Sequence, residues 1–429
     1  MRRRDLLAAV PPGLWAASGL STTRMAFAQP APAPTLAPAP GAGEPVRKVV
    51  GYQHFLALMA DGSVVGWGRH RDGQLGEQAL LSRRRYGVAA PVRVALPRPA
   101  VDIAAGTYSS FAVLDDGSVW AWGRGTDGEL GLGPAVVSAR LPNGEIGIAT
   151  PQRIAELQDI VQVTVEGNVG HALRRDGTLF AWGSRDGGLV GDGRVSPRWG
   201  ESLPKADTPV AASLLGGVRL ARLGLHSAGM AISAEGRVLQ WPLPRGPAKE
   251  GDVWQPLTAA VDEVALPDAA IDIAATGGAR LALLRDGTVW AWGYNMQGLF
   301  GSGARADTND PDRWRAKPQP VPGVRGAVAL AAGTAGRHAL VLLRDGTLRG
   351  WGNTDWGQIG AGVDGDSQPK AVTPKISGVV RVWAGGNNSF ALTKDGRFWA
   401  WGASQEGAGP LGTQSKLPVV WPLSLLQPS

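Results

Sequence analysis

The sequence contains no cysteine among its 429 residues. Disulfide bonds, a catalytic thiol and a lipidated cysteine anchor are therefore excluded, and the stability of the fold has to come from packing. Histidine is scarce too, with five copies. The sequence also lacks a Gly-x-x-x-x-Gly-Lys-Ser/Thr loop and a strand–Gly-x-Gly-x-x-Gly–helix unit, so it predicts no nucleotide-binding site and no cofactor.

A large excess of charge of one sign is also missing. The chain has 43 basic and 36 acidic side chains, a net charge of +7. Without residues 1–28 the numbers are 39 and 35, a net charge of +4. Domains that bind nucleic acid usually carry a larger and more clustered positive charge. We therefore expect no nucleic-acid partner.

The first 45 residues lack the alternation of a folded segment. Arg2–Arg4 precede a moderately apolar stretch, and Ala26-Phe27-Ala28 offers a small-x-small cleavage site. Residues 1–28 therefore predict a twin-arginine-like signal peptide and a periplasmic or secreted protein; a disordered basic N-terminus is the alternative. The stretch is interrupted at Pro11-Pro12-Gly13, so we expect no membrane span. Residues 29–45, rich in Pro and Ala, predict a semi-rigid linker.

A short phrase recurs through the rest of the chain. Its clearest copy is Asp116-Gly117, a strand ending in Trp122-Gly123, and a second turn at Gly128-Glu129-Leu130-Gly131. Successive repeat tryptophans are 55, 60, 59, 51, 59 and 50 residues apart. Such a period is typical of a repeat architecture. The seven repeat tryptophans are Trp67, Trp122, Trp182, Trp241, Trp292, Trp351 and Trp401.

Each copy has the content of one propeller blade. Asp-Gly between apolar runs predicts a tight hairpin, and every unit indicates about four short antiparallel strands. Bulky residues alternate with Gly or Ala before the repeat Trp in six of the seven copies, with Gln240 in the fourth, so both faces of the sheet are expected to be covered. The sequence predicts an all-β, seven-bladed β-propeller over residues 46–429. We expect the C-terminal strand near Leu417–Leu423 to close the ring by completing the first blade.

The Asp-Gly…Trp-Gly…Gly-x-Leu-Gly copies, preceded at best by Gly-x-x-His as at Gly51–His54, resemble the regulator of chromosome condensation repeat family. The resemblance covers residues 46–423 and implies a seven-bladed propeller, here as an exported bacterial member. Eukaryotic members exchange guanine nucleotide on a small nuclear GTPase and dock on chromatin, a role that the predicted export signal disfavours. A secreted bacterial relative inhibits β-lactamases with one face, which implies an envelope-enzyme inhibitor as an alternative.

The connections after Leu-Gly contain tryptophans beyond the repeat set and a basic run. Aromatic and arginine side chains are typical of binding surfaces, and equivalent connections reach the same end of a propeller. We therefore predict a shared binding face, with each Trp folding back onto its own blade as the alternative. The predicted binding residues are Trp199, Trp254, Trp314, Arg83, Arg84 and Arg85.

The sequence shows no catalytic constellation. His54 and His338 stand at equivalent repeat positions two blades apart, which favours a structural role over a metal site. The acidic runs near Asp307–Asp312 and Asp364–Asp366 match no calcium loop. We predict a non-catalytic, monomeric scaffold that binds an unknown protein or cell-wall ligand. A hydrolase or lyase with converging carboxylates at the central opening is the alternative from another class.

Overall fold

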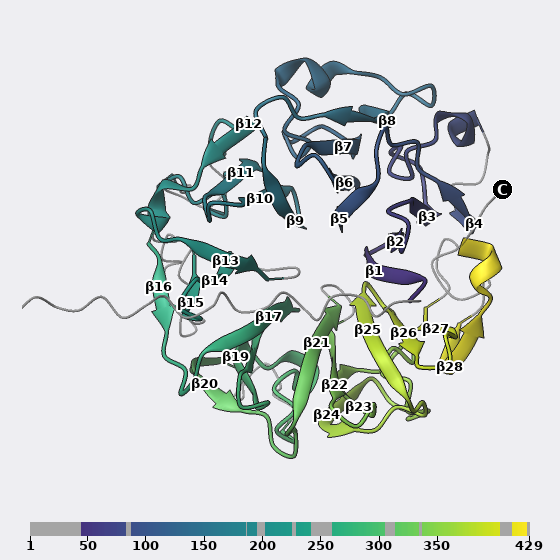
Figure 1. Ribbon diagram of the computed structural model, residues 1–429, viewed down its shortest axis with the longest axis vertical. Coiled ribbons are helices and arrows are strands. Elements are labelled where there is room, and N and C mark those ends of the chain that lie inside the picture. The colour runs from purple at the N-terminus through teal and green to yellow at the C-terminus, as the bar shows by residue number, and fades with distance from the viewer. Residues whose placement is uncertain are drawn as a thin grey trace, which may run out of the picture. The chain divides into compact units, whose positions relative to one another are not determined.

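The computed structural model describes residues 44–82, 87–185, 187–194, 202–224, 229–241, 260–304, 314–333, 337–403 and 414–426. These residues form seven four-stranded antiparallel sheets, in which strands adjacent in sequence pair with one another. Figure 1 shows the sheets as blades around a centre, with the first strand of each blade innermost. The prediction of an all-β, seven-bladed propeller with four-stranded blades is confirmed.

Each blade uses four consecutive strands. Blades 1 to 3 contain β1 (Val46–Gly51), β2 (His54–Met59), β3 (Val64–Arg69), β4 (Gly87–Arg93), β5 (Ala100–Ala105), β6 (Ser109–Leu114), β7 (Val119–Arg124), β8 (Gly147–Arg153), β9 (Ile160–Glu166), β10 (Val169–Arg174), β11 (Leu179–Gly183) and β12 (Ala206–Ala211). Blades 4 and 5 contain β13 (Leu220–Leu223), β14 (Met230–Ser233), β15 (Val238–Gln240), β16 (Asp262–Val264), β17 (Ala270–Thr276), β18 (Ala279–Leu284), β19 (Val289–Tyr294) and β20 (Trp314–Pro320). Blades 6 and 7 contain β21 (Ala327–Gly333), β22 (His338–Leu343), β23 (Leu348–Asn353), β24 (Ser367–Val372), β25 (Val379–Gly385), β26 (Asn388–Thr393), β27 (Phe398–Gly402) and β28 (Ser415–Trp421).

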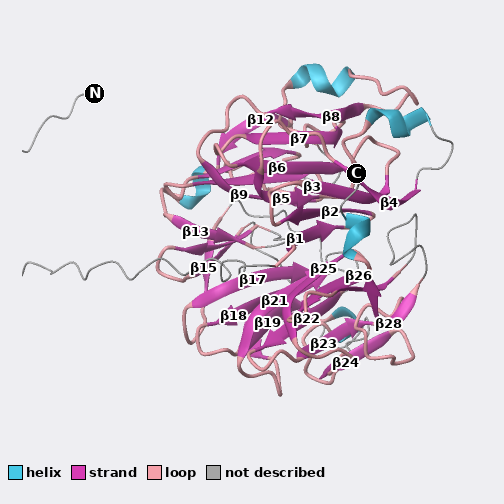
Figure 2. Ribbon diagram, turned by 45° about the vertical axis from the view of Figure 1, so that its right-hand side comes forward, coloured by secondary structure: helices cyan, strands magenta, loops and turns pink. Residues whose placement is uncertain are grey.

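Helical structure in the described residues is confined to short 3-10 helices in the connections (Figure 2). They include η3 (Ser213–Leu215) between blades 3 and 4, and η8 (Leu423–Leu426) after the last strand. The degenerate fourth repeat still forms a complete blade, but its strands have only three or four residues.

The Asp-Gly turn joins the second and third strands of each blade. In blade 2 the Asp116 carboxylate accepts hydrogen bonds from the Ser118 backbone N–H at 2.9 Å and the Ser118 hydroxyl at 2.6 Å. Gly117 has a φ of 77°, which glycine adopts without steric cost. The residue pair thus fixes the hairpin, as its sequence predicts.

The Trp-Gly pair ends the third strand and fills the space between blades. Gly123 has a φ of 107°, and a Cβ there would lie 2.3 Å from the carbonyl oxygen of Tyr108. The seven repeat tryptophans are at most 1% exposed. Trp122 packs with Leu56 and Val94 of blade 1, so the indole of each repeat contributes to the interface with the blade before it.

A hydrogen-bonded relay fastens blade 1 to blade 2. The carbonyl oxygen of Gln74, in the Gly-x-Leu-Gly turn of blade 1, accepts from the Trp122 Nε1–H at 2.9 Å and from the Ser110 hydroxyl at 2.8 Å. Ser110 Oγ also lies 2.8 Å from Nε2 of His54. Because the serine proton goes to the carbonyl, the imidazole must donate through Nε2. His338, Ser389, Gln358 and Trp401 repeat this relay between blades 6 and 7.

The predicted closing strand is wrong. β28 (Ser415–Trp421) pairs with β27 (Phe398–Gly402) and completes blade 7. Blade 1 already has four strands of its own, beginning with β1 at Val46. The segment after the last Leu-Gly is therefore the outer strand that every repeat has in that position. The ring closes by side-chain packing and not by strand exchange.

The seam between blades 7 and 1 is an aromatic cluster. Trp67 of blade 1 lies edge-on to Trp421 at a centroid distance of 4.9 Å and to Phe390 at 5.9 Å, both from blade 7. Phe55 stacks on Trp67 at 5.6 Å. An ion pair at 2.8 Å between Arg381 in β25 and Glu44, just before β1, adds a polar contact at the same boundary. The seam thus rests mainly on buried aromatic surface.

Candidate binding face

The two ends of the strands define two faces of the propeller. One face, called here the long-loop face, carries the turns between first and second strands and the connections between third and fourth strands. The other, called the Asp-Gly face, carries the Asp-Gly turns and the connections between blades. In the sequence, Arg83–Arg85, Trp199 and Trp254 fall between the third and fourth strands of their blades, and Trp314 begins a fourth strand.

Most of the predicted binding residues lie outside the described residues, namely Arg83, Arg84, Arg85, Trp199 and Trp254. Trp314 is described, and it begins β20 as a half-buried side chain. Its ring packs edge-on against Tyr294 of the adjacent β19, with centroids 4.6 Å apart. Trp314 therefore lies against its own blade, and the predicted shared face with the other five residues stays a prediction.

The described part of the long-loop face contains a cluster that the sequence analysis missed. Tyr108, in the first turn of blade 2, is flanked by Arg69 at the end of β3 and Arg124 at the end of β7. The guanidinium carbon of Arg124 lies 3.8 Å from the Tyr108 ring centroid, and that of Arg69 lies 5.4 Å away. This Arg69–Tyr108–Arg124 cluster spans blades 1 and 2.

Hydrogen bonds hold the two arginines in place. Arg69 donates to the Gln53 side-chain oxygen at 2.9 Å, and Arg124 donates to Glu129 at 3.1 Å and to Asn168 at 3.2 Å. Burial raises the pKa of Glu129, and the hydrogen bonds it accepts, including that from Arg124, oppose the shift. Arginine planes fixed over an aromatic ring lose little conformational freedom on binding.

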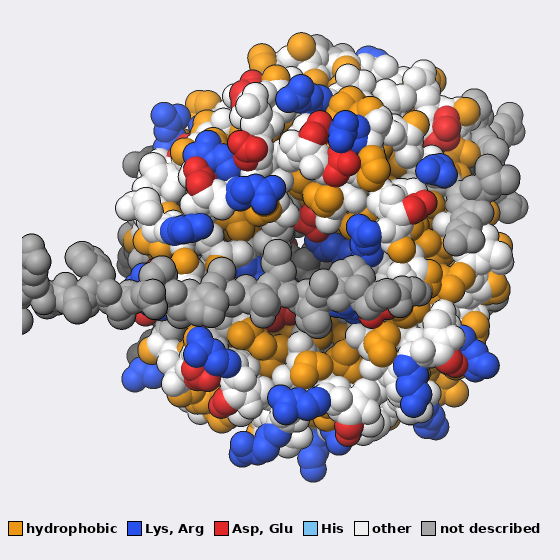
Figure 3. Space-filling view, viewed as in Figure 1, with side chains coloured by type: hydrophobic (Ala, Val, Ile, Leu, Met, Phe, Trp, Pro, Cys, Tyr) orange, Lys and Arg blue, Asp and Glu red, His pale blue; other side chains and the backbone are white. Residues whose placement is uncertain are grey.

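The surroundings of the cluster balance its positive charge. Arg71 of blade 1 forms an ion pair at 2.5 Å with Glu145 of blade 2, and Asp127 lies 3.2 Å from Lys205 and 3.6 Å from Arg124. Figure 3 shows one face of the molecule, on which this cluster is not marked, and there too Lys and Arg are interspersed with Asp and Glu and with apolar side chains. Recognition by such a surface depends on shape and directional hydrogen bonds more than on net charge.

A sequence signal for the cluster exists. Arg69 and Arg124 each follow the Trp-Gly pair of their repeat directly, and Tyr108 stands immediately before the second strand of repeat two. Those positions meet at one end of adjacent blades, so identical residue types after successive Trp-Gly pairs indicate a row on one face. The sequence analysis considered only the variable connections and missed it.

The central opening is surrounded by polar side chains at one repeated position. The third residue of the innermost strand points to the next blade in four cases, and these contacts link five consecutive blades. They are Lys48 to Asp102 at 2.6 Å, Asp102 to the Val163 N–H at 2.9 Å, Gln162 to the Leu223 backbone at 2.8 and 3.0 Å, and Arg222 to Asp272 at 2.9 Å.

These contacts bear on the enzyme alternative. Asp102 and Asp272 each pair with a cation and accept from a backbone N–H. Burial raises the pKa of Asp272, while Arg222 opposes that shift. A carboxylate held in this way links neighbouring blades. Its oxygens are already engaged in these contacts, which does not favour proton exchange with a substrate.

The histidines show a similar structural use. His54 is fully buried in the relay described above, and burial lowers its pKa to about 3. His171 makes a 2.8 Å contact through Nε2 with the carbonyl oxygen of Leu189, and His226 lies outside the described residues. Within the described ranges, no three His, Asp or Glu side chains gather as metal ligands would. The helices in those ranges are also too short or too polar to cross a membrane.

Comparisons with known proteins agree with this architecture. The model of the regulator of chromosome condensation (RCC1) repeat matches residues 61–113 and 116–168, and a second RCC1 repeat model matches residues 100–129 and 379–408. Mouse E3 ubiquitin-protein ligase HERC2 is 27% identical over 374 residues, which are 84% of this chain but 7% of the ligase. The Arabidopsis thaliana ultraviolet-B receptor UVR8 is 27% identical over 336 residues, 76% of this chain and 70% of the receptor.

Solved structures show the same fold. Human WBSCR16 superposes with a TM-score of 0.66 at 21% identity, covering 82% of this chain and 88% of that one. A chain from the structure of Kap60 bound to yeast RCC1 (Prp20) superposes with a TM-score of 0.65 at 19% identity, covering 95% and 91%. The fold defines a seven-bladed β-propeller. The RCC1 repeat models match residues in the first three blades and in blade 7.

Proposed function

We propose that this protein is a non-catalytic scaffold of the cell envelope that binds a protein partner on its long-loop face. The observation that carries the proposal is the Arg69–Tyr108–Arg124 cluster, with two guanidinium groups fixed on one phenol ring. Tyrosine and arginine dominate binding hot spots because they combine area with directional hydrogen bonds.

The relatives support a binding role in general terms. One solved relative is a complex of yeast RCC1 with another protein, Kap60. The curated relatives include a ubiquitin ligase and a light receptor. This chain spans 7% of the ligase, so the ligase activity does not follow from the match. What this chain shares with each is the repeat fold, which is suited to presenting a rigid surface.

Site-specific photo-cross-linking tests the proposal. A photoreactive phenylalanine analogue at Tyr108 is expected to cross-link one envelope protein, identified by mass spectrometry. The same analogue at Arg285, exposed on the Asp-Gly face of blade 5, serves as the matched control and is expected to give no such product. Equal cross-linking from both positions would contradict the assignment of the long-loop face.

Affinity for the identified partner gives the second test. The double variant Tyr108→Ala/Arg124→Ala is expected to weaken binding by at least about 30-fold, roughly 2 kcal/mol, which is the threshold for a hot spot. Arg285→Ala is expected to bind like the unmodified chain. Because nearby charges are balanced, raising the salt concentration should change the affinity little. An envelope enzyme captured in this way would identify the scaffold as its inhibitor or regulator.

The envelope location is a separate part of the proposal and rests on residues 1–28. In a host with twin-arginine export, the mature chain is expected in the periplasmic fraction with Gln29 at its N-terminus. Replacing Arg2, Arg3 and Arg4 with lysine should retain the precursor in the cytoplasm. A lysine variant that is exported and cleaved normally would remove this part of the proposal.

A further inference from the structure

The connection from blade 3 to blade 4 differs from those between the other blades. It has eight residues, 212–219, whereas the other five connections between consecutive blades have five or six. The added length forms the 3-10 helix η3 and a turn in which Gly216 and Gly217 have φ values of 57° and 79°. The chain therefore bows away from the sheet before β13 begins.

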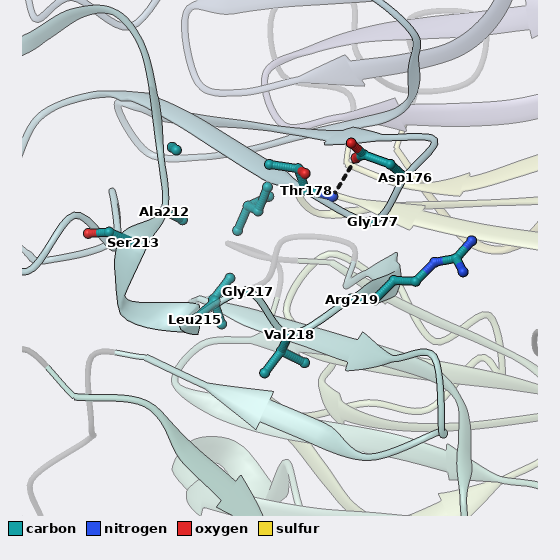
Figure 4. A pocket seen from close by; sticks show the side chains of 11 residues that line it. Asp176, Gly177, Thr178, Ala212, Ser213, Leu215, Gly217, Val218 and Arg219 are labelled. Atoms are coloured by element: carbon teal, nitrogen blue, oxygen red, sulfur yellow. Dashed lines mark hydrogen bonds between the residues drawn. The ribbon is translucent and has the colours of Figure 1, made fainter. Parts of the chain in front are cut away.

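A pocket of about 240 Å³ lies beneath this connection, on the Asp-Gly face (Figure 4). One wall is the hairpin of β10 and β11, and the other wall is the connection itself. Drug-sized ligands occupy pockets of roughly 300–1,000 Å³. A volume below that range fits a ligand about the size of one amino-acid residue.

The two ends of the pocket differ in chemistry. Leu179, Ala212, Leu215 and Val218 supply apolar surface. Asp176 and Arg219 lie at the other end in Figure 4, where the Arg219 side chain extends outward from the pocket. A Cβ at Gly177 would lie 2.4 Å from the Arg219 Cγ atom, so the turn holds the stem of the arginine in place while its guanidinium stays exposed.

The two charged side chains at the polar end, Asp176 and Arg219, differ in whether another side chain already pairs with them. Asp176 forms a 2.7 Å ion pair with Arg174 and accepts from the Thr178 N–H at 2.9 Å. The Arg174 hydrogen bond is the main cause that holds the pKa of Asp176 well below its usual range. Within the described part of the chain, the Arg219 guanidinium has no hydrogen-bond or ion-pair partner. The pocket thus offers an open cation beside apolar surface.

We propose that this pocket binds a carboxylate carried by a branched apolar group of about one residue in size. The carboxylate pairs with Arg219, whose planar fork suits two parallel hydrogen bonds. The apolar group enters between Leu179 and Leu215. Two sources present this chemistry, namely the C-terminal leucine or valine of a polypeptide and a free branched-chain acid.

Calorimetric titration of the full chain tests the proposal with N-acetyl-L-leucine and its carboxamide. The acid is expected to bind at least about tenfold more tightly than the amide, a difference of 1.4 kcal/mol. Arg219→Gln should abolish that difference, and Arg344→Gln, an exposed arginine beside the Asp-Gly turn of blade 6, should preserve it. Equal binding of acid and amide, no detectable binding of either, or an unchanged preference in Arg219→Gln would overturn the proposal.

A second variant tests the apolar end. Val218→Phe should fill the pocket and weaken both ligands, with a midpoint of thermal unfolding close to that of the unmodified chain. Undiminished binding by this folded variant would also overturn the proposal. A hexapeptide with a free C-terminal leucine, compared with 3-methylbutanoate, distinguishes the two sources, because only a polypeptide gains affinity from residues before the leucine. These outcomes are independent of the long-loop face, which lies at the other end of the strands.

Discussion

The interface between blades 1 and 2 and the seam between blades 7 and 1 solve the same packing problem with different chemistry. The first uses the His54–Ser110–Gln74–Trp122 relay and the Lys48–Asp102 ion pair. At the seam, the Nε1–H of Trp67 has no acceptor among the described residues. There, the ring of Trp67 meets rings of blade 7 edge-on, and Phe390 and Trp421 of blade 7 stack on each other.

Chain connectivity explains the difference. Blades 1 and 2 are joined by the short connection 94–99, so they stay close together even when their interface loosens. Blades 7 and 1 have no such connection and lie at opposite ends of the propeller sequence. Closing a loop of this length costs conformational entropy, and burial of large aromatic side chains is the strongest non-covalent means to offset it.

The largest effect is expected from Trp67→Ala at the seam. Truncating a buried tryptophan costs about 3–5 kcal/mol, and the lost aromatic pairs add about 0.5–1.5 kcal/mol. Trp122→Ala, at the interface between blades 1 and 2, lacks the second contribution but loses a hydrogen bond to the Gln74 carbonyl. Each alanine variant is therefore compared with the phenylalanine variant at the same position, which has lost the indole N–H already. Urea unfolding followed by circular dichroism measures both. A larger loss of stability for Trp122→Ala would show that the seam is not the special interface.

For polar contacts, we expect the larger loss of stability around the central opening and the smaller loss at the seam. Arg222→Ala leaves the buried Asp272 carboxylate unpaired, which is expected to cost about 3 kcal/mol. Glu44→Ala at the seam is the comparison, with an expected cost of about 1 kcal/mol, because Glu44 precedes β1 and pairs across a boundary already held by aromatic packing. Equal losses in urea unfolding would mean that the seam also depends on its ion pair.

The repeats made the fold predictable, since Asp-Gly, Trp-Gly and Gly-x-Leu-Gly each fix a local backbone conformation. The assignment of each strand to its blade was harder to predict. The apolar strand at 417–423 was assigned to blade 1, although Val46–Gly51 already supplies the first strand of that blade. Counting strands from the first Asp-Gly turn in both directions would have placed it in blade 7.

The candidate site was less predictable because it forms between blades. Arg69 and Tyr108 are 39 positions apart in sequence, and their contact follows only from the packing of two adjacent sheets. Trp314 showed the converse problem. Its neighbour Tyr294 is paired with it across β19 and β20, and the sequence indicated neither that register nor the ring contact. The type of side chain was enough to name candidate binding residues. Which of them lie close together could be seen only in the three-dimensional structure.

Glu166, the last residue of β9 in blade 3, tests whether a buried carboxylate without a partner costs stability. One of its carboxylate oxygens is buried without a partner among the described residues, and burial raises its pKa to about 7. A pKa raised in the folded state means that stability falls as pH rises from about 4.5 to 7. Glu166→Gln should therefore stabilise the protein at pH 8 by about 2 kcal/mol and have little effect at pH 4.5. A pH-independent difference in urea unfolding would contradict this account.

The smallest effect separates the hydrogen bond of a repeat tryptophan from its packing. Trp122→Phe removes the donor to the Gln74 carbonyl, whereas Trp67→Phe removes a donor that has no acceptor among the described residues. Both variants lose a similar volume, so Trp122→Phe is expected to cost about 1 kcal/mol more in urea unfolding. The equivalent turn for Trp67 is Gly409–Gly412, which lies outside the described residues. Equal costs would therefore indicate that this turn accepts from Trp67, and that the seam combines the relay of the other interfaces with its aromatic packing.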